Sequence, residues 1–184
     1  CVIVPTYNRL PILQKCIRAL SEQTFPLNKY QILVIDDGST DGTKEWLETM
    51  QSEQTNLTIL LHPTNLGRVK ARNHGIQATS SPYIIFVDSD VIVTPHFIEQ
   101  HYQIHQKYRK KIISQGILIQ TSHFENPTSE KWHLWTDFSR AFFATGNVSI
   151  ARHALLEAGL FDEAFQGYGW EDLELGYRLK KQGY

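Results

Sequence analysis

Two aspartates follow directly after an apolar stretch in the middle of the chain. Residues 83–87 are all apolar or aromatic, and Asp88, Ser89 and Asp90 come next. Such a run is typical of a strand buried on both faces of a sheet. Two carboxylates at its end cannot both be buried without a counter-charge. We therefore expect them at the mouth of a cleft, where open α/β sheets bind ligands; an acidic surface turn is the alternative.

The Asp88 and Asp90 pair suits a hard divalent cation. Mg²⁺ and Mn²⁺ prefer oxygen ligands and often bind one or two carboxylates together with substrate phosphates. Arg68 and Arg72 lie at the start of a predicted helix, where they can pair with phosphate with help from the helix N-terminus. A solvated helix face is the alternative for both arginines.

Two further acidic pairs occur along the chain. Asp36 and Asp37 follow a second apolar run, and a turn with a helix cap is the plain alternative there. A carboxylate at this point can also accept the imide N–H of a uracil ring, with Tyr7 as a flat face against the base. Glu171 and Asp172 open a predicted helix whose dipole stabilises their ionised forms. A general base for an acceptor hydroxyl is one interpretation of this pair, and an ordinary N-terminal helix acid is the other.

Several common catalytic motifs are absent from the sequence. It contains no GxGxxG after the first predicted strand, no Walker A motif, no HExxH and no GxSxG. These absences argue against a dinucleotide-binding Rossmann site and a hydrolase triad. His101 and His105 are four residues apart, and we interpret them as part of a solvated helix face.

The elements that must position these residues alternate along the chain. Helical spacing, apolar runs and turn residues predict strands at 1–4, 32–35, 57–61 and 83–87, a loop at 5–8, and helices at 11–22, 41–53 and 68–79. A further helix is predicted to start at Thr94-Pro95, with Thr94 as its cap. The second half is predicted to contain strands at 112–119 and 147–150, a helix at 152–158 and a last helix from Trp170. This order predicts an α/β fold with a mostly parallel central sheet flanked by helices.

Composition limits the class of protein. The 184 residues are enough for one domain, 41% of them are hydrophobic, and the formal net charge is -1. Without a basic excess, nucleic acid is not an expected partner. Cys1 and Cys16 fit buried thiols in a reducing compartment. No apolar stretch reaches the roughly 18 residues of a membrane span. Because the chain lacks an initiator Met and opens inside a strand pattern, we expect a fragment truncated at both ends.

Five segments together resemble family 2 glycosyltransferases of the GT-A fold. They occur in family order and span nearly the whole chain: residues 2–9, residues 34–43, residues 65–68 with 71–75, residues 86–90, and residues 169–174. The Gly-Trp-Glu-Asp segment at 169–172 is similar to that of galactosyl-, N-acetylgalactosaminyl- and chondroitin-polymerase-type enzymes. The resemblance implies a single GT-A domain over 1–184 with a Rossmann-like N-terminal half. Residues 1–93 would be the nucleotide-binding half and residues 94–184 the acceptor and catalytic half.

The resemblance also implies roles on the nucleotide side. Pro5 and Tyr7 would line the uridine pocket, and Asp37 would bond the uracil. Arg9 and Arg68 would lie near the nucleotide or its diphosphate.

On the metal and sugar side, Asp88, Ser89 and Asp90 would form the DxD element. Asp90 would be the principal ligand of Mn²⁺ or Mg²⁺, and Asp88 would lie nearer the ribose or the metal. Gly146 and Asn147 would lie beside the donor sugar and acceptor. Such enzymes often have a further histidine ligand downstream of the last helix, beyond the end of this chain.

For catalysis, the resemblance implies Asp172 as the base and Glu171 as a partner of acceptor or donor sugar hydroxyls. Four aromatic residues are candidates for stacking on sugar faces: Trp132, Trp135, Tyr168 and Trp170. For the first two, packing in the core or a loop is the alternative we favour.

The implied activity is inverting, metal-dependent transfer of a hexose or N-acetylhexosamine from a UDP-sugar to a hydroxyl of a saccharide or glycoconjugate. This would place the protein in polysaccharide biosynthesis, in the cytoplasm or at the inner face of the membrane, with any peripheral membrane association made by segments outside the chain. Two alternatives stay open: a nucleotidyltransferase, and a non-catalytic module that binds a nucleotide sugar. The transferred sugar, acceptor and oligomeric state do not follow from the sequence.

Overall fold

The computed structural model describes residues 1–108, 111–119, 121, 142–165 and 169–184. Six strands form one sheet in the order β3-β2-β1-β4-β6-β5. The strands are β1 (Val2–Thr6), β2 (Ile32–Asp36), β3 (Leu57–Leu61), β4 (Tyr83–Val87), β5 (Ile113–Gln115) and β6 (Asn147–Ala151). The helices are α1 (Leu10–Ser21), α2 (Thr43–Glu53), α3 (Arg68–Ala78), α4 (Phe97–Lys107), α5 (Arg152–Glu157) and α6 (Glu171–Lys181), with a short 3-10 turn at Leu27–Lys29.

The sheet is mostly parallel, as predicted. Strands β1 to β4 run in parallel, whereas β6 pairs antiparallel with both β4 and β5. The chain moves outward from β1 through β2 to β3 and then returns to place β4 on the other side of β1. The gap between the carboxyl ends of β1 and β4 is therefore the switch point where open α/β sheets bind ligands. Since β6 runs the opposite way, its first residues lie at this same edge.

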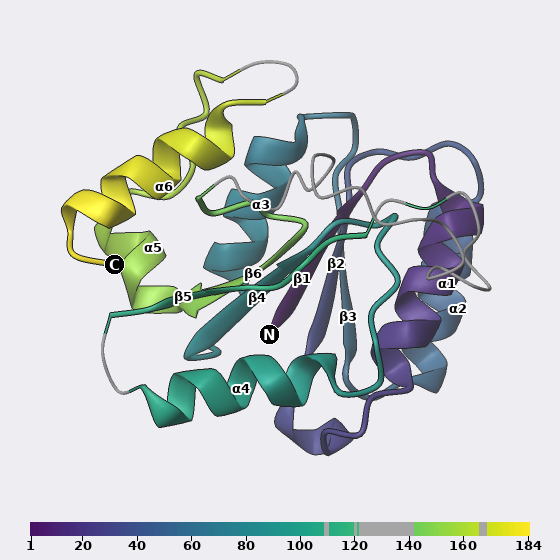
Figure 1. The fold of residues 1–184 in the computed structure, drawn as a ribbon. Coiled ribbons are helices and arrows are strands. Elements are labelled where there is room, and N and C mark those ends of the chain that lie inside the picture. The colour runs from purple at the N-terminus through teal and green to yellow at the C-terminus, as the bar shows by residue number, and fades with distance from the viewer. Residues whose placement is uncertain (109–110, 120, 122–141, 166–168) are drawn as a thin grey trace.

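Helices cover both faces of the sheet (Figure 1). On one face, Leu13, Leu47 and Ile98 of α1, α2 and α4 pack on Val4 and Val34. The other face is covered by apolar residues of α3, α5 and α6. Neighbouring residues of a strand point to opposite faces. This alternation explains why β1, β2 and β4 are apolar at nearly every position.

Helix α3 lies especially close to the sheet. A Cβ at Gly75 would lie 2.9 Å from Ile35 Cδ1 and 3.0 Å from Ile3 Cγ2. A side chain at this position would therefore push the helix away from β1 and β2. Because Arg68 and Arg72 belong to the same helix, this close approach also sets how far they lie from the sheet.

Several predicted boundaries are wrong. Pro5 and Thr6 belong to β1 rather than to a loop, because β2 extends alongside and pairs with both. Helix α4 begins at Phe97 after His96, and Thr94 does not cap it with its side chain; its carbonyl accepts the Phe97 amide. The Ile98 amide in the first turn donates instead to Gln23 Oε1 at 3.0 Å. The strand predicted at 112–119 is limited to Ile113–Gln115.

The solvated face predicted for His101 and His105 is also wrong. Both side chains are 5% exposed and face β6. Polar partners on β6 allow this burial, and helical spacing alone cannot reveal such partners.

The aromatic residues Trp132, Trp135 and Tyr168, which we considered for sugar stacking, lie outside the described residues. Within the described ranges, none of the helices combines the length and apolarity that a membrane span requires.

Candidate active site

The loops that follow β1 and β2 are joined to each other. Asn8 has φ 50°, accepts the Thr40 amide through Oδ1 at 2.7 Å and donates its own amide to Ser39 Oγ at 2.8 Å. Asp41 accepts the first amide of α1, at Leu10, at 2.9 Å. These bonds hold the chain after β1 in a fixed turn, with Tyr7 44% exposed at the edge of the sheet. The exposure of Tyr7 in this turn is compatible with the prediction that its ring lies against a uracil base.

Asp37, which follows β2, is a buried residue and is only 4% exposed. It accepts the amides of Leu66 and Gly67, both at 2.8 Å, and pairs with His62 Nδ1 at 2.7 Å. The loop before α3 is thereby fixed against β2. Gly38 makes this contact possible, since a Cβ there would lie 2.6 Å from the backbone of Thr64. The uracil-binding role of Asp37 stays a prediction; in the structure its bonds go to the chain.

Asp88 and Asp90 each face an arginine. Arg72 Nη2 lies 3.1 Å from Asp88 Oδ1, and Arg9 Nη1 lies 2.5 Å from Asp90 Oδ2. The two carboxylate side chains are 41% and 48% exposed, respectively. Since Arg9 follows β1 and Asp90 follows β4, their ion pair spans the switch point. Arg72 and Arg9 therefore supply the counter-charge that the sequence predicted for the two aspartates. Ser89, which lies between them in the chain, is buried.

Arg72 is the centre of what we call the carboxylate cluster: Arg72 with Asp88, Glu171 and Asp172. Its Nη1 lies 3.2 Å from Glu171 Oε1 and 3.6 Å from Asp172 Oδ1. Burial opposes the charge of Arg72, but Asp172, Asp88 and Glu171 outweigh it and raise the pKa of Arg72. Arg72 is 3% exposed, so the solvated face considered for it is wrong. One buried cation thus joins the acid after β4 to the two acids of α6.

Asp172 lies in the first turn of α6, with its side chain 25% exposed. The Thr145 hydroxyl and amide donate to Asp172 Oδ2 at 2.8 and 3.2 Å. Burial raises the pKa of Asp172, although Arg72 and the Thr145 bonds oppose the rise. A raised pKa makes a carboxylate a better proton acceptor near neutral pH.

Glu171 is 2% exposed, and Arg68 Nε lies 3.4 Å from its Oε1. Six buried side-chain atoms of the described residues have no hydrogen-bond partner, and three of them belong to the carboxylate cluster: Arg72 Nε, Glu171 Oε2 and Asp172 Oδ1. Such atoms are uncommon in folded proteins and indicate a missing partner. Trp170, which precedes α6 with φ 75°, is 71% exposed.

The start of β6 reaches the same edge. A Cβ at Gly146 would lie 3.5 Å from Asp88 Oδ2, so the backbone here runs beside the acid. The side chain of Asn147 points to the other face of the sheet, where its Oδ1 lies 3.0 Å from His101 Nε2. Of the two residues predicted to lie by the donor sugar, only Gly146 borders the acids.

A divalent cation fits Asp88 and Asp90, provided that other ligands come from a substrate. Within the described ranges, no group of three or more His, Cys, Asp or Glu side chains is arranged to hold a metal ion. The two half-exposed carboxylates match the common arrangement of one or two acids plus substrate phosphates. Both lie at the switch point, where the phosphates of a nucleotide would approach.

Sequence reasoning missed the central position of Arg72 and the contact from Thr145. A signal for Arg72 exists: Val69, Arg72, Asn73 and Ile76 form one helical stripe, and all four are buried. Polar residues in an otherwise buried stripe indicate an internal polar contact. No comparable signal marks Thr145, which precedes a strand and meets Asp172 only in the folded chain.

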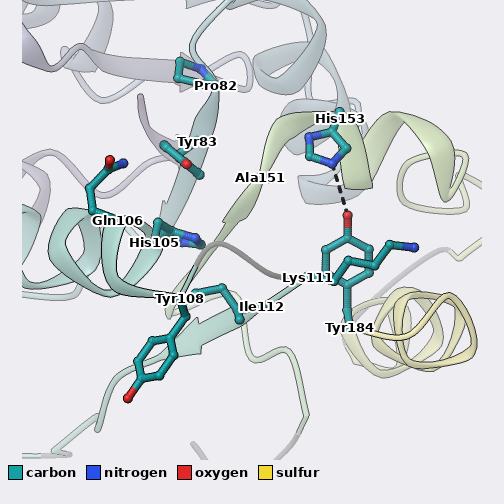
Figure 2. A pocket seen from close by; sticks show the side chains of 10 residues that line it. All are labelled: Pro82, Tyr83, His105, Gln106, Tyr108, Lys111, Ile112, Ala151, His153 and Tyr184. Carbon is teal, nitrogen blue, oxygen red and sulfur yellow. Dashed lines mark hydrogen bonds between the residues drawn. The ribbon is translucent and has the colours of Figure 1, made fainter.

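A cavity of about 610 Å³ lies at the other end of β4 (Figure 2). Tyr83, His105, Tyr108, Lys111 and Tyr184 are among its lining residues. Because Tyr83 begins β4 and Asp88 follows its end, this cavity is separate from the acidic site.

The sequence profile described as glycosyl transferase family 2 matches residues 1–159. The chain belongs to this family. Validoxylamine A glucosyltransferase from Streptomyces hygroscopicus subsp. jinggangensis is 27% identical over 217 residues, covering 99% of this chain and 51% of the relative. Chondroitin synthase from Escherichia coli is 27% identical over 221 residues, covering 99% of this chain and 32% of the synthase. The chain thus spans about half or less of the length of these relatives.

Solved structures show the same fold. The mannosyltransferase PcManGT from Pyrobaculum calidifontis, in complex with GDP-Man and Mn²⁺, has a TM-score of 0.78 at 19% identity and covers 100% of this chain and 52% of its own. Staphylococcus aureus TarS 1-349, in complex with UDP-GlcNAc, has a TM-score of 0.74 at 22% identity, with coverages of 97% and 52%. The predicted GT-A fold is confirmed.

Proposed function

We propose that this family 2 glycosyltransferase moves a hexose or N-acetylhexosamine from a UDP-sugar to a hydroxyl of a saccharide or glycoconjugate, with inversion at the anomeric carbon. The observation that carries the proposal is the state of Asp172: Oδ2 is held by Thr145, whereas Oδ1 lies 3.6 Å from Arg72 Nη1 and is buried without a hydrogen-bond partner. An acceptor hydroxyl would complete this carboxylate.

In the proposed reaction, the acceptor oxygen attacks the anomeric carbon while the bond from that carbon to the diphosphate oxygen breaks. Asp172 takes the proton of the acceptor hydroxyl, and UDP leaves with the bond's electron pair. A single displacement inverts the configuration. Burial raises the pKa of Asp172 and the buried Arg72 opposes that rise, which favours the ionised form; Arg72 also pairs with Asp88.

On the donor side, Tyr7 and Pro5 would lie against the uridine, and Arg9 and Arg68 would approach the diphosphate. Asp88 and Asp90 would hold Mn²⁺ or Mg²⁺. When bound, such a cation supplies positive charge that stabilises the departing diphosphate. The complexes of TarS with UDP-GlcNAc and of PcManGT with GDP-Man and Mn²⁺ support a nucleotide sugar and a metal as a class, and leave the base and sugar to experiment.

The decisive assay follows UDP release with Mn²⁺ across a panel of UDP-sugars, with GDP-mannose included. Asp172→Asn should keep donor binding and lose about two to four orders of magnitude in turnover. Asp90→Ala should lose metal-dependent binding of UDP as well as transfer. Turnover unaffected by Asp172→Asn would exclude the base assignment. Release of pyrophosphate from a nucleoside triphosphate would identify a nucleotidyltransferase, and binding without turnover would identify a non-catalytic module.

A further inference from the structure

Helix α4 directs two histidines into the protein, where they meet β6. We call His101, His105, Ser149 and Asn147 the histidine cluster. Ser149 Oγ lies 2.8 Å from His101 Nδ1 and 2.8 Å from His105 Nε2. His101 Nε2 lies 3.0 Å from Asn147 Oδ1. All four side chains belong to buried residues, and the active-site chemistry uses none of these bonds.

The Ile117 carbonyl fixes the direction of the hydrogen bonds in this cluster when His101 is neutral. Asn147 Nδ2 lies 3.2 Å from the Ile117 carbonyl, which only accepts, so the amide must donate there. Asn147 Oδ1 therefore faces His101 Nε2 and requires an N–H from it. A neutral His101 then accepts at Nδ1 from the Ser149 hydroxyl, and that hydroxyl accepts from His105 Nε2–H. The bonds run in one direction from His105 to the Ile117 carbonyl.

Burial supports the neutral state of both rings. It lowers the pKa of His101, and with help from His101 it lowers the pKa of His105 to about 4. His105 also stacks on Tyr83, with ring centroids 4.6 Å apart. Both side chains line the cavity drawn in Figure 2.

The far end of the cluster reaches the active site. The Asn147 amide lies over Gly116, where a Cβ would come within 2.3 Å of Nδ2. Leu118, two residues on, packs against Gly146, where a Cβ would lie 2.7 Å from its Cδ1. Gly146 in turn borders Asp88. The direction of one amide group thus sets the position of the segment 116–118 that backs the acid.

We propose that His101, acting through Asn147, is a positioning residue for sugar transfer. It holds the amide so that Asn147 clamps Ile117 and keeps residues 116–118 behind Gly146 and Asp88. The inference rests on the proposed function, because its effect is on transfer from the donor. If His101 and Asn147 act in this way, residues on the α4 side of the sheet contribute to kcat together with the acids on the other side.

The first test uses the unaltered protein. Long-range ¹H–¹⁵N spectra of the histidine rings at neutral pH should show His101 and His105 as neutral Nε2–H tautomers. In Ser149→Ala, which removes the donor to His101 Nδ1, His101 should become a mixture of tautomers. A His101 ring protonated at Nδ1 in the unaltered protein would overturn the proposal whether or not any sugar is transferred.

The second test separates positioning from folding. His101→Leu removes the donor to Asn147, whereas His101→Gln can still donate from its amide. In His101→Leu, kcat for transfer should fall about 10- to 100-fold. Affinity for UDP measured without a divalent metal should be unchanged, because the uridine side lies beside β1 and β2. His101→Gln should restore most of the loss in kcat. Equal loss in both variants, or loss of metal-free UDP affinity in parallel with kcat, would overturn the proposal.

Gly116→Ala reaches the same amide from the other side. Its Cβ displaces the Asn147 amide without touching a histidine. We therefore expect kcat to fall as in His101→Leu, and affinity for UDP without a divalent metal to persist. Unchanged kcat would contradict the clamp. If no donor gives transfer with the unaltered protein, the proposed function fails, and the tautomer experiment still decides the geometry of the cluster.

Discussion

Two polar clusters lie on opposite sides of the sheet near β4 and β6, and they differ in charge and in the number of atoms left without a hydrogen bond. The carboxylate cluster holds one arginine and three acids, whereas the histidine cluster is neutral. In the described part of the chain, the carboxylate cluster leaves Arg72 Nε, Glu171 Oε2 and Asp172 Oδ1 without a hydrogen bond, and the histidine cluster leaves no such atom. Fully satisfied polar networks rigidify a fold, whereas a buried polar atom without a partner requires an explanation such as a catalytic role or a bound water or ion.

The difference shows how one strand can serve two purposes. Asn147 and Ser149 of β6 face α4, where their partners form a closed set. Thr145 and Gly146, just before the strand, face the acids. Rigidity on one side of the sheet therefore supports a site that must stay open on the other.

Removing Arg72 should have the largest effect on the difference between the two clusters, because Arg72 is the cation that joins the three acids. Arg72→Met removes the cation that pairs with Asp88 and Asp172 and, among the described residues, leaves Glu171 with Arg68 alone; breaking a buried pair costs about 3–5 kcal/mol. Urea unfolding should show this loss, and transfer should be abolished. Arg18→Met is the matched control, because Arg18 makes an exposed pair with Glu22. Equal stability of the two variants would mean that Arg72 does not hold the cluster together.

Thr145→Val tests how the carboxylate cluster sets the pKa of Asp172. The Thr145 hydroxyl bond lowers the pKa of Asp172 against the effect of burial, so its removal should raise that pKa. The acidic limb of the kcat–pH profile should then move to higher pH. Thr43→Val is the control, since Thr43 makes a similar bond to Asp41 outside the site at 2.6 Å. A profile that moves in neither variant would argue against Asp172 as the titrating base.

The neutral cluster predicts a pH dependence of stability. The pKa of His105 is lowered from 6.5 to about 4, so the unfolded chain binds more protons between these values and stability falls as the pH drops through them. The raised pKa of Asp172 acts in the opposite direction, so the comparison must be with a variant. Melting temperatures from pH 7 to 4.5 should fall less for His105→Gln than for the unaltered protein. Parallel curves would show that His105 stays exposed to protons in the fold.

The smallest effect on stability is expected at the switch point. Arg9 and Asp90 form a half-exposed pair, and such pairs contribute about 1 kcal/mol or less. Arg9→Ala should therefore barely change the urea midpoint but weaken binding of UDP with Mn²⁺ in calorimetry. Lys44→Ala, which removes an exposed partner of Glu48, should change neither. A large loss of stability in Arg9→Ala would assign Arg9 to the fold instead of the nucleotide.

Much of the framework could be predicted from local patterns. The strand at 83–87 and the helix at 68–79 were predicted almost to the residue, because apolar runs and helical spacing report burial directly. The predicted ends of elements were wrong where pairing with another segment sets the boundary. Strand β5 is short because only three of its residues pair with β6, and no property of residues 112–119 reveals that limit.

The candidate site divides in the same way. The order of the motifs indicated the family, and the acids at the ends of strands indicated the edge where ligands bind. The sequence did not indicate that Arg72 lies between Asp88 and Asp172, since the residues come from three distant segments. The inward turn of His101 and His105 was likewise invisible, because their partners Ser149 and Asn147 lie more than 40 residues away.

By itself, then, the sequence determined the α/β order of elements, the family and the acids at the edge of the sheet, because each depends on residues close together in the chain. Only the tertiary structure decided which charges compensate one another and which oxygens stay without a partner. The switch of β4 to the other side of β1 and the reversed direction of β6 bring Arg9 to Asp90 and Thr145 to Asp172. Ion pairs and hydrogen bonds act over a few ångströms of space, and only the folded chain sets those distances.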